Sequence, residues 1–285
     1  KRLICKMNLL GIDFEDWYHP QLVQKYVKNE KHEPRMFKGI DKILEMLRRN
    51  DTLATFFVVG ELLETNPEIF DKITENEHEI AFHTMYHTRI DSPNFKENFR
   101  NEIEKFSKLT NKKSKGFRAP TFSLNETSSW IIDLLSEYDY IYDSSIVPAK
   151  TDLYGTPNAE IKPYRISSDS LENDTIDGKL IEFPLLVTKF LGKKVPAGGG
   201  FYLRTLPMRV IKNAIRQYEK QEIPATFYIH SWELTPEFMP KLPLSTKDKF
   251  ITYHNLQKAF TKTNQLIQEF EFTSFEKFLE NNSIS

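Results

Sequence analysis

The feature that most constrains the fold is an alternation of short apolar runs with longer amphipathic stretches. Each apolar run has the length of a β-strand, and the stretch after it repeats apolar residues at helical spacing. We expect seven strands, at residues 9–14, 54–59, 79–82, 116–118, 140–142, 226–229 and 270–273. We expect helices over residues 36–47, from Pro67 onward, and over 94–109, 126–137, 207–221, 248–268 and 275–281.

This order of elements indicates a parallel sheet covered by helices. No glycine-rich nucleotide loop follows the first strand, which favours a barrel over an open sheet. The predicted fold is therefore an incomplete or distorted (β/α) barrel of about seven parallel strands. The 285 residues are expected to form a single domain.

One segment breaks the alternation. Residues 146–205 are polar and rich in turn formers, apart from an apolar run at 180–187 and three glycines at 198–200. Such an inserted segment could be a lid or a small sheet over the site, or it could be an ordinary connection. The sequence leaves both alternatives open.

The composition of the chain limits the kinds of molecule that it is expected to bind. The 39 lysines and arginines balance 40 acidic residues, so the chain has no strong field for nucleic acid. Its one cysteine, Cys5, can form no internal disulfide. Residues 1–6 are basic and then briefly apolar, too short for a signal peptide or a transmembrane segment. We therefore expect a cytoplasmic protein, or a periplasmic or cell-surface one if a targeting segment was removed; the oligomeric state stays open.

Three acids, Asp13, Glu15 and Asp16, follow the first strand. An acidic loop is often solvated or caps a helix. Crowded carboxylates also repel one another unless a cation separates them, however, and barrel enzymes assemble their sites at the C-terminal ends of strands. The position therefore favours a functional site.

Two histidines, His83 and His87, follow the third strand at a spacing of four. Imidazole is a common ligand for zinc and similar metals, and two histidines with one carboxylate make a three-ligand catalytic site with a position open for water. The acidic loop could supply the carboxylate. The pattern predicts a divalent metal, zinc first, with cobalt, nickel or manganese as alternatives.

Two further residues stand at strand ends. Arg118 could pair with a surface acid, or it could hold Asp13 ionised as a base. His230 could be a structural histidine, but on the same face as the metal site it would be the natural proton donor to a leaving amine.

Read in order, these residues resemble the polysaccharide deacetylase family with the NodB homology domain, also called carbohydrate esterase family 4. The resemblance spans nearly the whole chain and rests on Asp13 with its following acids, His83-Thr84-Met85-Tyr86-His87, Arg118-Ala119-Pro120 and Ile229-His230. Residues 142–145, 199–204 and 228–233 resemble more particularly a branch associated with bacterial exopolysaccharide biosynthesis.

The resemblance implies a metal-dependent hydrolase that removes N-acetyl groups from the amino sugars of a bacterial polysaccharide or glycan precursor. It implies Asp13 as the base, Arg118 orienting it, and His230 as the acid. The acidic metal ligand beside His83 and His87 is either Glu15 or Asp16. Strand alternation puts Glu15 on the face of Asp13, whereas the family's usual aspartate ligand slightly favours Asp16.

The resemblance also places an oxyanion donor at the backbone N–H near Thr121. Asp143 could support His230 or the metal site, or it could equally be an acidic cap on the neighbouring loop. Aromatic residues near the motifs could stack on sugar rings, namely Trp17, Tyr18, Phe201, Tyr202 and Trp232. Two alternatives remain: a hydrolase of another, cyclic amide on the same fold, and a non-catalytic glycan-binding relative.

Overall fold

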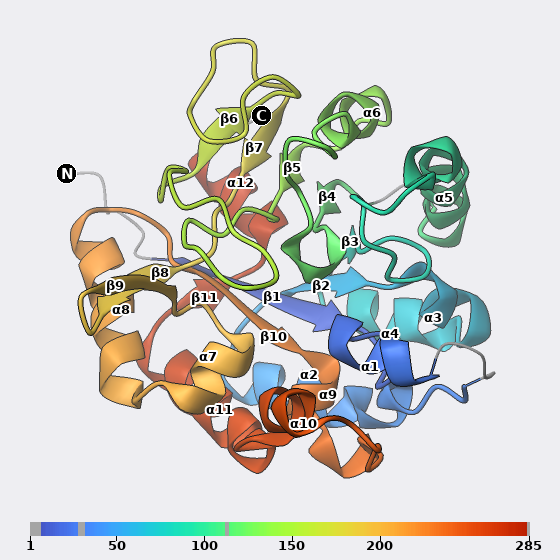
Figure 1. Ribbon diagram of the computed structural model, residues 1–285, viewed down its shortest axis with the longest axis vertical. Helices are drawn as coiled ribbons and strands as arrows, with labels where there is room; N and C mark the ends of the chain where they lie inside the picture. Colours follow the sequence, from blue (N-terminus) through green and yellow to red (C-terminus); the bar gives the residue numbers. More distant parts are fainter. Residues whose placement is uncertain (1–6, 28–31, 112–113, 284–285) are drawn as a thin grey trace.

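A curled, mostly parallel β-sheet organises the computed structural model, which describes residues 7–27, 32–111 and 114–283 (Figure 1). The strand order is β10-β1-β2-β3-β4-β5-β7-β6, with β11 beside β1. Neighbouring strands run parallel except β6 and β7, which are antiparallel. The strands are β1 (Asn8–Phe14), β2 (Thr55–Val58), β3 (Glu79–Phe82), β4 (Gly116–Phe117), β5 (Tyr142–Asp143), β6 (Tyr164–Ile166), β7 (Leu180–Glu182), β10 (Thr226–His230) and β11 (Phe272–Thr273).

The segment after β7 bends the sheet toward closure. Leu185 forms a parallel bridge with Thr226 of β10, and Gly199 forms another with Tyr228. Gly199 has a φ of +135°, and a side chain there would overlap the Tyr228 carbonyl, so only glycine fits. These bridges join the last part of the sheet to β10, and the predicted incomplete barrel is confirmed.

Helices surround the sheet (Figure 1). They are α1 (Gln21–Val27), η1 (Met36–Gly39), α2 (Ile40–Arg49), α3 (Gly60–Thr65), α4 (Glu68–Glu75), α5 (Phe95–Leu109), η2 (Pro120–Phe122), α6 (Ile131–Glu137), α7 (Gly200–Thr205), α8 (Met208–Lys220), α9 (Ser231–Leu234), η3 (Pro236–Phe238), α10 (Thr246–Tyr253), η4 (Leu256–Lys258), α11 (Ala259–Glu269) and α12 (Phe275–Asn282). The prediction of one helix over 248–268 is wrong, because the chain turns between α10 and α11, where Asn255 is left-handed with a φ of 51°.

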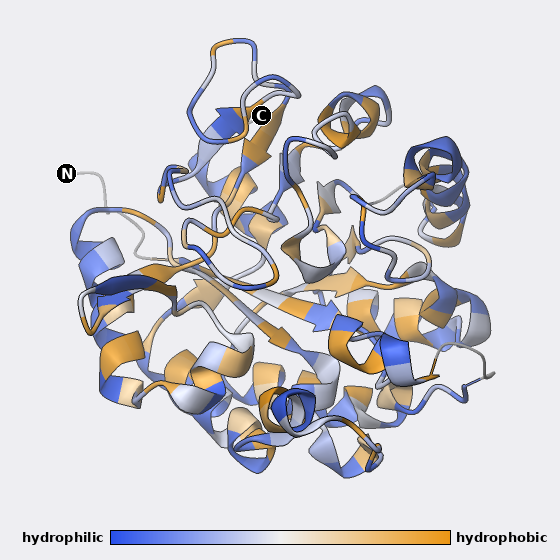
Figure 2. Ribbon diagram, in the orientation of Figure 1, coloured by the Kyte–Doolittle hydropathy of each residue, from blue (hydrophilic) through white to orange (hydrophobic). Residues whose placement is uncertain are grey.

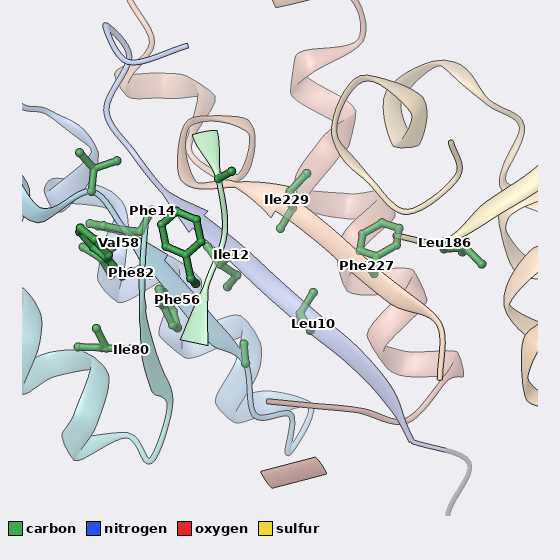
Figure 3. Close-up of a cluster of buried hydrophobic side chains, with 14 of the residues drawn as sticks. Leu10, Ile12, Phe14, Phe56, Val58, Ile80, Phe82, Leu186, Phe227 and Ile229 are labelled. Carbon is green, nitrogen blue, oxygen red and sulfur yellow. The ribbon is translucent and has the colours of Figure 1, made fainter. Parts of the chain in front are cut away.

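Alternation along β1 sorts its side chains between two faces. Leu10, Ile12 and Phe14 point toward the surrounding helices and pack with apolar residues of β2 and β3 (Figure 3). The intervening positions, which include Gly11 and Asp13, face the barrel interior. A side chain at Gly11 would lie 2.6 Å from Nη1 of Arg118, so this glycine leaves room for an arginine inside the barrel.

The polar segment at 146–205 adds structure beside the barrel. It contributes the antiparallel strand β6 and a separate two-stranded hairpin of β8 (Val187–Phe190) and β9 (Lys193–Pro196). Within the described ranges, no helix has the length and apolar character needed to cross a membrane.

Candidate active site

The C-terminal ends of neighbouring strands gather the predicted site residues. Asp13 of β1 is in register with His230 of β10, and Phe82 of β3 is in register with Phe117 of β4, which brings the next residues, His83 and Arg118, together. These ends surround a cavity of about 130 Å³. The cavity is lined by Asp13, Glu15, His83, His87, Thr121, His230 and Trp232, among others.

Asp13 and Arg118 form an ion pair in the barrel interior. Nη1 of Arg118 donates to Oδ1 of Asp13 at 2.6 Å, and both side chains are buried. The remaining guanidinium nitrogens donate to the carbonyl and hydroxyl of Ser144, each at 2.9 Å. A buried ion pair is tolerated when its other hydrogen-bonding groups are satisfied in this way. The arrangement fixes the orientation of Asp13, which lines the cavity.

Glu15, His83 and His87 form a compact buried group. One potential ligand atom from each lies within 4.8 Å of the others, and Oε2 of Glu15 is 2.6 Å from Nε2 of His87. Nδ1 of His83 lies 2.7 Å from the carbonyl oxygen of Arg118, which can only accept, so Nδ1 carries the proton and Nε2 is free to bind a metal. Two imidazoles and a carboxylate fit the donor set of a catalytic divalent-metal site.

Charges in the group favour an ionised acid and a neutral histidine. Burial alone would raise the pKa of Glu15, but His87, His230 and His83 together lower that pKa well below its ordinary value. Burial, with repulsion from His87, lowers the pKa of His83 to about 4. These are the protonation states that metal binding requires.

Asp16, slightly favoured by the resemblance as the acidic ligand, lies outside this group. Its Oδ2 accepts hydrogen bonds from the backbone N–H groups of Arg35 and Met36, at 2.7 and 2.9 Å, and its Oδ1 accepts from that of Trp17. The carboxylate therefore ties two loops together. The structure favours Glu15, in keeping with strand alternation, because Glu15 shares the interior face with Asp13.

His230 is held by a carboxylate, which an arginine holds in turn, and neither residue was expected in the site. Nδ1 of His230 is 2.6 Å from Oε2 of Glu233, and Nε of Arg204 donates to Oε1 of Glu233 at 2.5 Å. Burial alone would lower the pKa of His230, but Glu233, with smaller contributions from Glu15 and Asp13, raises it to about 9. A protonated His230 is suited to give up a proton.

Asp143 does not contact His230, and its carboxylate lies on the neighbouring loop instead. It accepts a hydrogen bond from Oγ of Ser145 at 2.7 Å, and that hydroxyl accepts one from the backbone N–H of Ala119 at 2.8 Å. Burial raises the pKa of Asp143, although hydrogen bonds with Glu182 and Ser145 oppose that shift. Asp143 thus supports the loop that carries Arg118.

The aromatic residues expected to contact the substrate fall into two groups, those that line a cavity and those that do not. Trp232 lines the cavity, donates from Nε1 to Glu15 at 2.8 Å and stacks on His230 with ring centroids 5.1 Å apart. Phe201 also lines the cavity, but Tyr202 lines only an adjoining outer one. Trp17 lies outside both: its Nε1 donates to the Glu33 carbonyl, and it packs against Tyr18. Trp17 and Tyr18 therefore belong to the packing of the first loop.

Thr121 lies on the cavity wall in a strained conformation. Its φ is +54°, and that of Phe122 is +50°. A β-branched residue rarely adopts a left-handed conformation, and such strain is concentrated at functional sites. The strained turn sets the direction of the backbone at the position expected for the oxyanion donor.

A larger cavity of about 660 Å³ adjoins the small one. The two share a ring of mostly apolar side chains, formed by Leu22, Leu153, Tyr154, Phe201 and Ile251. The inner space suits a group as small as an acetamide, and the outer one has room for a larger moiety.

Comparison with known families agrees with this arrangement. Residues 37–140 match the family described as polysaccharide deacetylase, and residues 144–280 match a domain of unknown function, DUF3473. Residues 37–140 of the chain thus resemble polysaccharide deacetylases, and the remaining match names no activity. The matched deacetylase region holds His83, His87 and Arg118, and the second region holds His230 and Glu233.

Individual relatives are distant. A peptidoglycan-N-acetylglucosamine deacetylase from Bacillus cereus is 35% identical over 71 residues, which are 25% of this chain and 26% of that protein. The chain spans 26% and 52% of the lengths of the two curated relatives it matches.

Solved structures show the fold. A protein described as a candidate polysaccharide deacetylase from Mycobacterium smegmatis aligns over 97% of this chain and 90% of its own, with a TM-score of 0.62 and 14% identity. Puue allantoinase aligns over 98% and 91%, with a TM-score of 0.55 and 12% identity. At these identities the likeness concerns the fold alone.

Proposed function

We propose that this protein is a metal-dependent hydrolase that removes N-acetyl groups from amino sugars of a bacterial polysaccharide or glycan precursor. One observation carries the proposal: Asp13, the Glu15–His83–His87 group and His230 all line one cavity. Arg118 holds Asp13 there, and Glu233 holds His230. A base, a metal-binding group and a protonated acid are the components that hydrolysis of an amide requires. The match of residues 37–140 to the polysaccharide deacetylase family supports the same reaction class.

A divalent cation such as zinc, held by Glu15, His83 and His87, would act as a Lewis acid toward the acetyl carbonyl and the attacking water. Asp13 takes a proton from that water as its oxygen bonds to the acetyl carbon. Arg118 keeps the Asp13 carboxylate aimed into the cavity. The negative charge that develops on the carbonyl oxygen lies near the backbone N–H of Thr121, a kind of contact worth about 10²–10³ in rate.

His230 completes the reaction. The C–N bond breaks, the nitrogen receives the proton from His230, and the products are acetate and a free amino sugar. Asp13 then holds one added proton and His230 lacks one, so proton exchange with solvent restores both groups. The Glu233 carboxylate stabilises the charged form of His230 before the transfer.

The cavities support a saccharide substrate. The acetamide would occupy the inner space of about 130 Å³ and the sugar rings the outer one of about 660 Å³. Trp232 and Phe201 in the inner cavity, and Tyr202 in the outer one, are aromatic surfaces on which sugar rings could stack. A role in exopolysaccharide biosynthesis is part of the proposal and rests on the resemblance of residues 142–145, 199–204 and 228–233.

Acetate release from N-acetylated oligosaccharides tests the proposal. The purified protein is assayed as prepared, after chelation, and after zinc or cobalt is restored, with Asp13→Asn beside it and with allantoin as the alternative substrate. We expect metal-dependent acetate release that the variant loses. Ring opening of allantoin without acetate release would support the cyclic-amide hydrolase instead, and metal binding with neither reaction would support a glycan-binding relative.

A further inference from the structure

The tip of the β8–β9 hairpin carries a residue that its turn disfavours. Leu191 and Gly192 form a two-residue turn in which both φ angles are positive, 49° and 78°, as in a type I′ turn. Such turns favour Asn-Gly because asparagine tolerates the left-handed conformation better than leucine does. Leu191 is 87% exposed, so no packing inside the protein offsets the cost.

The strands beside the turn carry a second unfavourable feature. Lys189 and Lys194 are direct cross-strand partners, and like charges placed opposite each other destabilise a hairpin. Residues 187–196 include a third lysine, Lys193, and no acid. Lys194 donates to the carbonyl of Pro157 at 3.1 Å, and no described acid forms an ion pair with any of the three. Figure 2 shows β9 as a hydrophilic strand.

We propose that this hairpin tip docks on the surface of an anionic lipid membrane. Leu191 would enter the apolar layer, while Lys189, Lys193 and Lys194 would lie among anionic headgroups. Lysines near such a surface each add to attraction, and stable binding generally combines an apolar contact with a basic cluster. The left-handed conformation of Leu191 and the repulsion between Lys189 and Lys194 are both unfavourable in the free protein. A contact with the membrane would offset each of them in the bound state.

Other partners fit the tip less well. An acidic glycan would attract the lysines, but it has no apolar layer to receive Leu191. A stable protein interface buries about 800 Å² on each partner, far more than one exposed apolar side chain at a narrow turn provides. The combination of one apolar side chain and three cations therefore favours the membrane.

A hydrogen bond connects the hairpin to a segment that also contributes a side chain to the cavity. The Lys194 hydrogen bond ties the hairpin to Pro157, three residues beyond Tyr154, which lines the cavity. The proposal does not depend on the catalytic chemistry, because it concerns a surface that contributes no side chain to either cavity.

Co-sedimentation with vesicles tests the docking surface in the 285-residue protein. Wild type is mixed with vesicles of phosphatidylglycerol and phosphatidylcholine, and with vesicles of phosphatidylcholine alone. Leu191→Asn is the informative variant, because asparagine suits the turn and should leave the free energy of unfolding equal or higher. We expect wild type to bind the anionic vesicles only and Leu191→Asn to lose about fivefold or more in bound fraction.

Ile176 provides the matched control. It is fully exposed, but Asp174 and Asp177 flank it, so an anionic surface should repel its loop. Ile176→Asn should therefore bind as wild type does. No vesicle binding by wild type, equal binding by Leu191→Asn, or binding to soluble polygalacturonate without binding to vesicles would each overturn the proposal.

Discussion

Arg204 donates a hydrogen bond from Nε to Glu233 at 2.5 Å, with both side chains buried, and the second oxygen of Glu233 contacts His230. The rest of the Arg204 guanidinium donates to the backbone carbonyls of Ile251 and His254 at the end of α10. Ile251 lines both cavities. The expected proton donor is thereby connected, through two buried charges, to a wall of the substrate space.

Glu233→Gln should weaken His230 as an acid. The pKa of His230, about 9, is raised above its ordinary value chiefly by Glu233, and His230 must be protonated to donate. Without that charge the pKa falls, so the alkaline limb of the kcat profile should move to lower pH, with little change in KM. The measurement is the pH dependence of acetate release at fixed metal loading. Glu237→Gln, on an exposed acid, is the control; an unshifted limb in Glu233→Gln would contradict the positioning role.

Arg118→Ala should destabilise the fold as well as abolish activity. The change leaves Asp13 buried without its partner, which typically costs about 3–5 kcal/mol of unfolding free energy. Urea denaturation measures the difference. Arg100→Ala removes an exposed pair with Glu137 and should leave the urea midpoint unchanged. Equal midpoints for the two variants would show that the interior pair is not required for stability.

Glu79 should make stability depend on pH. At the end of the barrel opposite the cavity, it accepts hydrogen bonds from Tyr142 and from the backbone N–H of Glu276, and burial raises its pKa to about 7. A raised pKa means that the folded protein binds the proton more tightly than the unfolded chain does. The stabilising contribution is therefore complete below about 4.5 and lost as pH rises through about 7.

Glu79→Gln should remove that dependence, because the amide stays neutral at every pH. Unfolding free energies from urea titrations at pH 5 and pH 8 provide the comparison. We expect wild type to lose stability relative to the variant between the two values. A difference that stays constant with pH would show that Glu79 does not titrate in this range.

Much of the site could be predicted because its residues stand at strand ends. The apolar runs of β1 and β3 are strong local signals, and parallel strands place their C-terminal ends together. Asp13, His83, Arg118 and His230 follow or end such strands, so their meeting at one cavity follows from the strand order.

Other parts of the candidate site could not be predicted, because they depend on contacts between residues that are far apart in the sequence. Asp16 accepts hydrogen bonds from the backbone N–H groups of Arg35 and Met36. These residues are about 20 positions away, so the sequence pattern around Asp16 does not indicate the contact. Arg204 and Glu233 are 29 positions apart in the sequence, so their pairing depends on how the inserted segment folds. Asp143 was expected to support His230 or the metal, or to cap the neighbouring loop, and its carboxylate accepts hydrogen bonds from Ser145.

The most direct test compares Glu15→Gln with Asp16→Asn, and measures bound zinc per chain and acetate release on the same samples. Circular dichroism and urea midpoints confirm that both variants are folded. We expect Glu15→Gln to lose both zinc and acetate release, because it removes the carboxylate that meets His83 and His87. Asp16→Asn should keep its zinc, because its carboxylate only joins two loops. Zinc and activity retained by folded Glu15→Gln, or zinc lost by folded Asp16→Asn, would contradict a metal-dependent deacetylase centred on Glu15, His83 and His87.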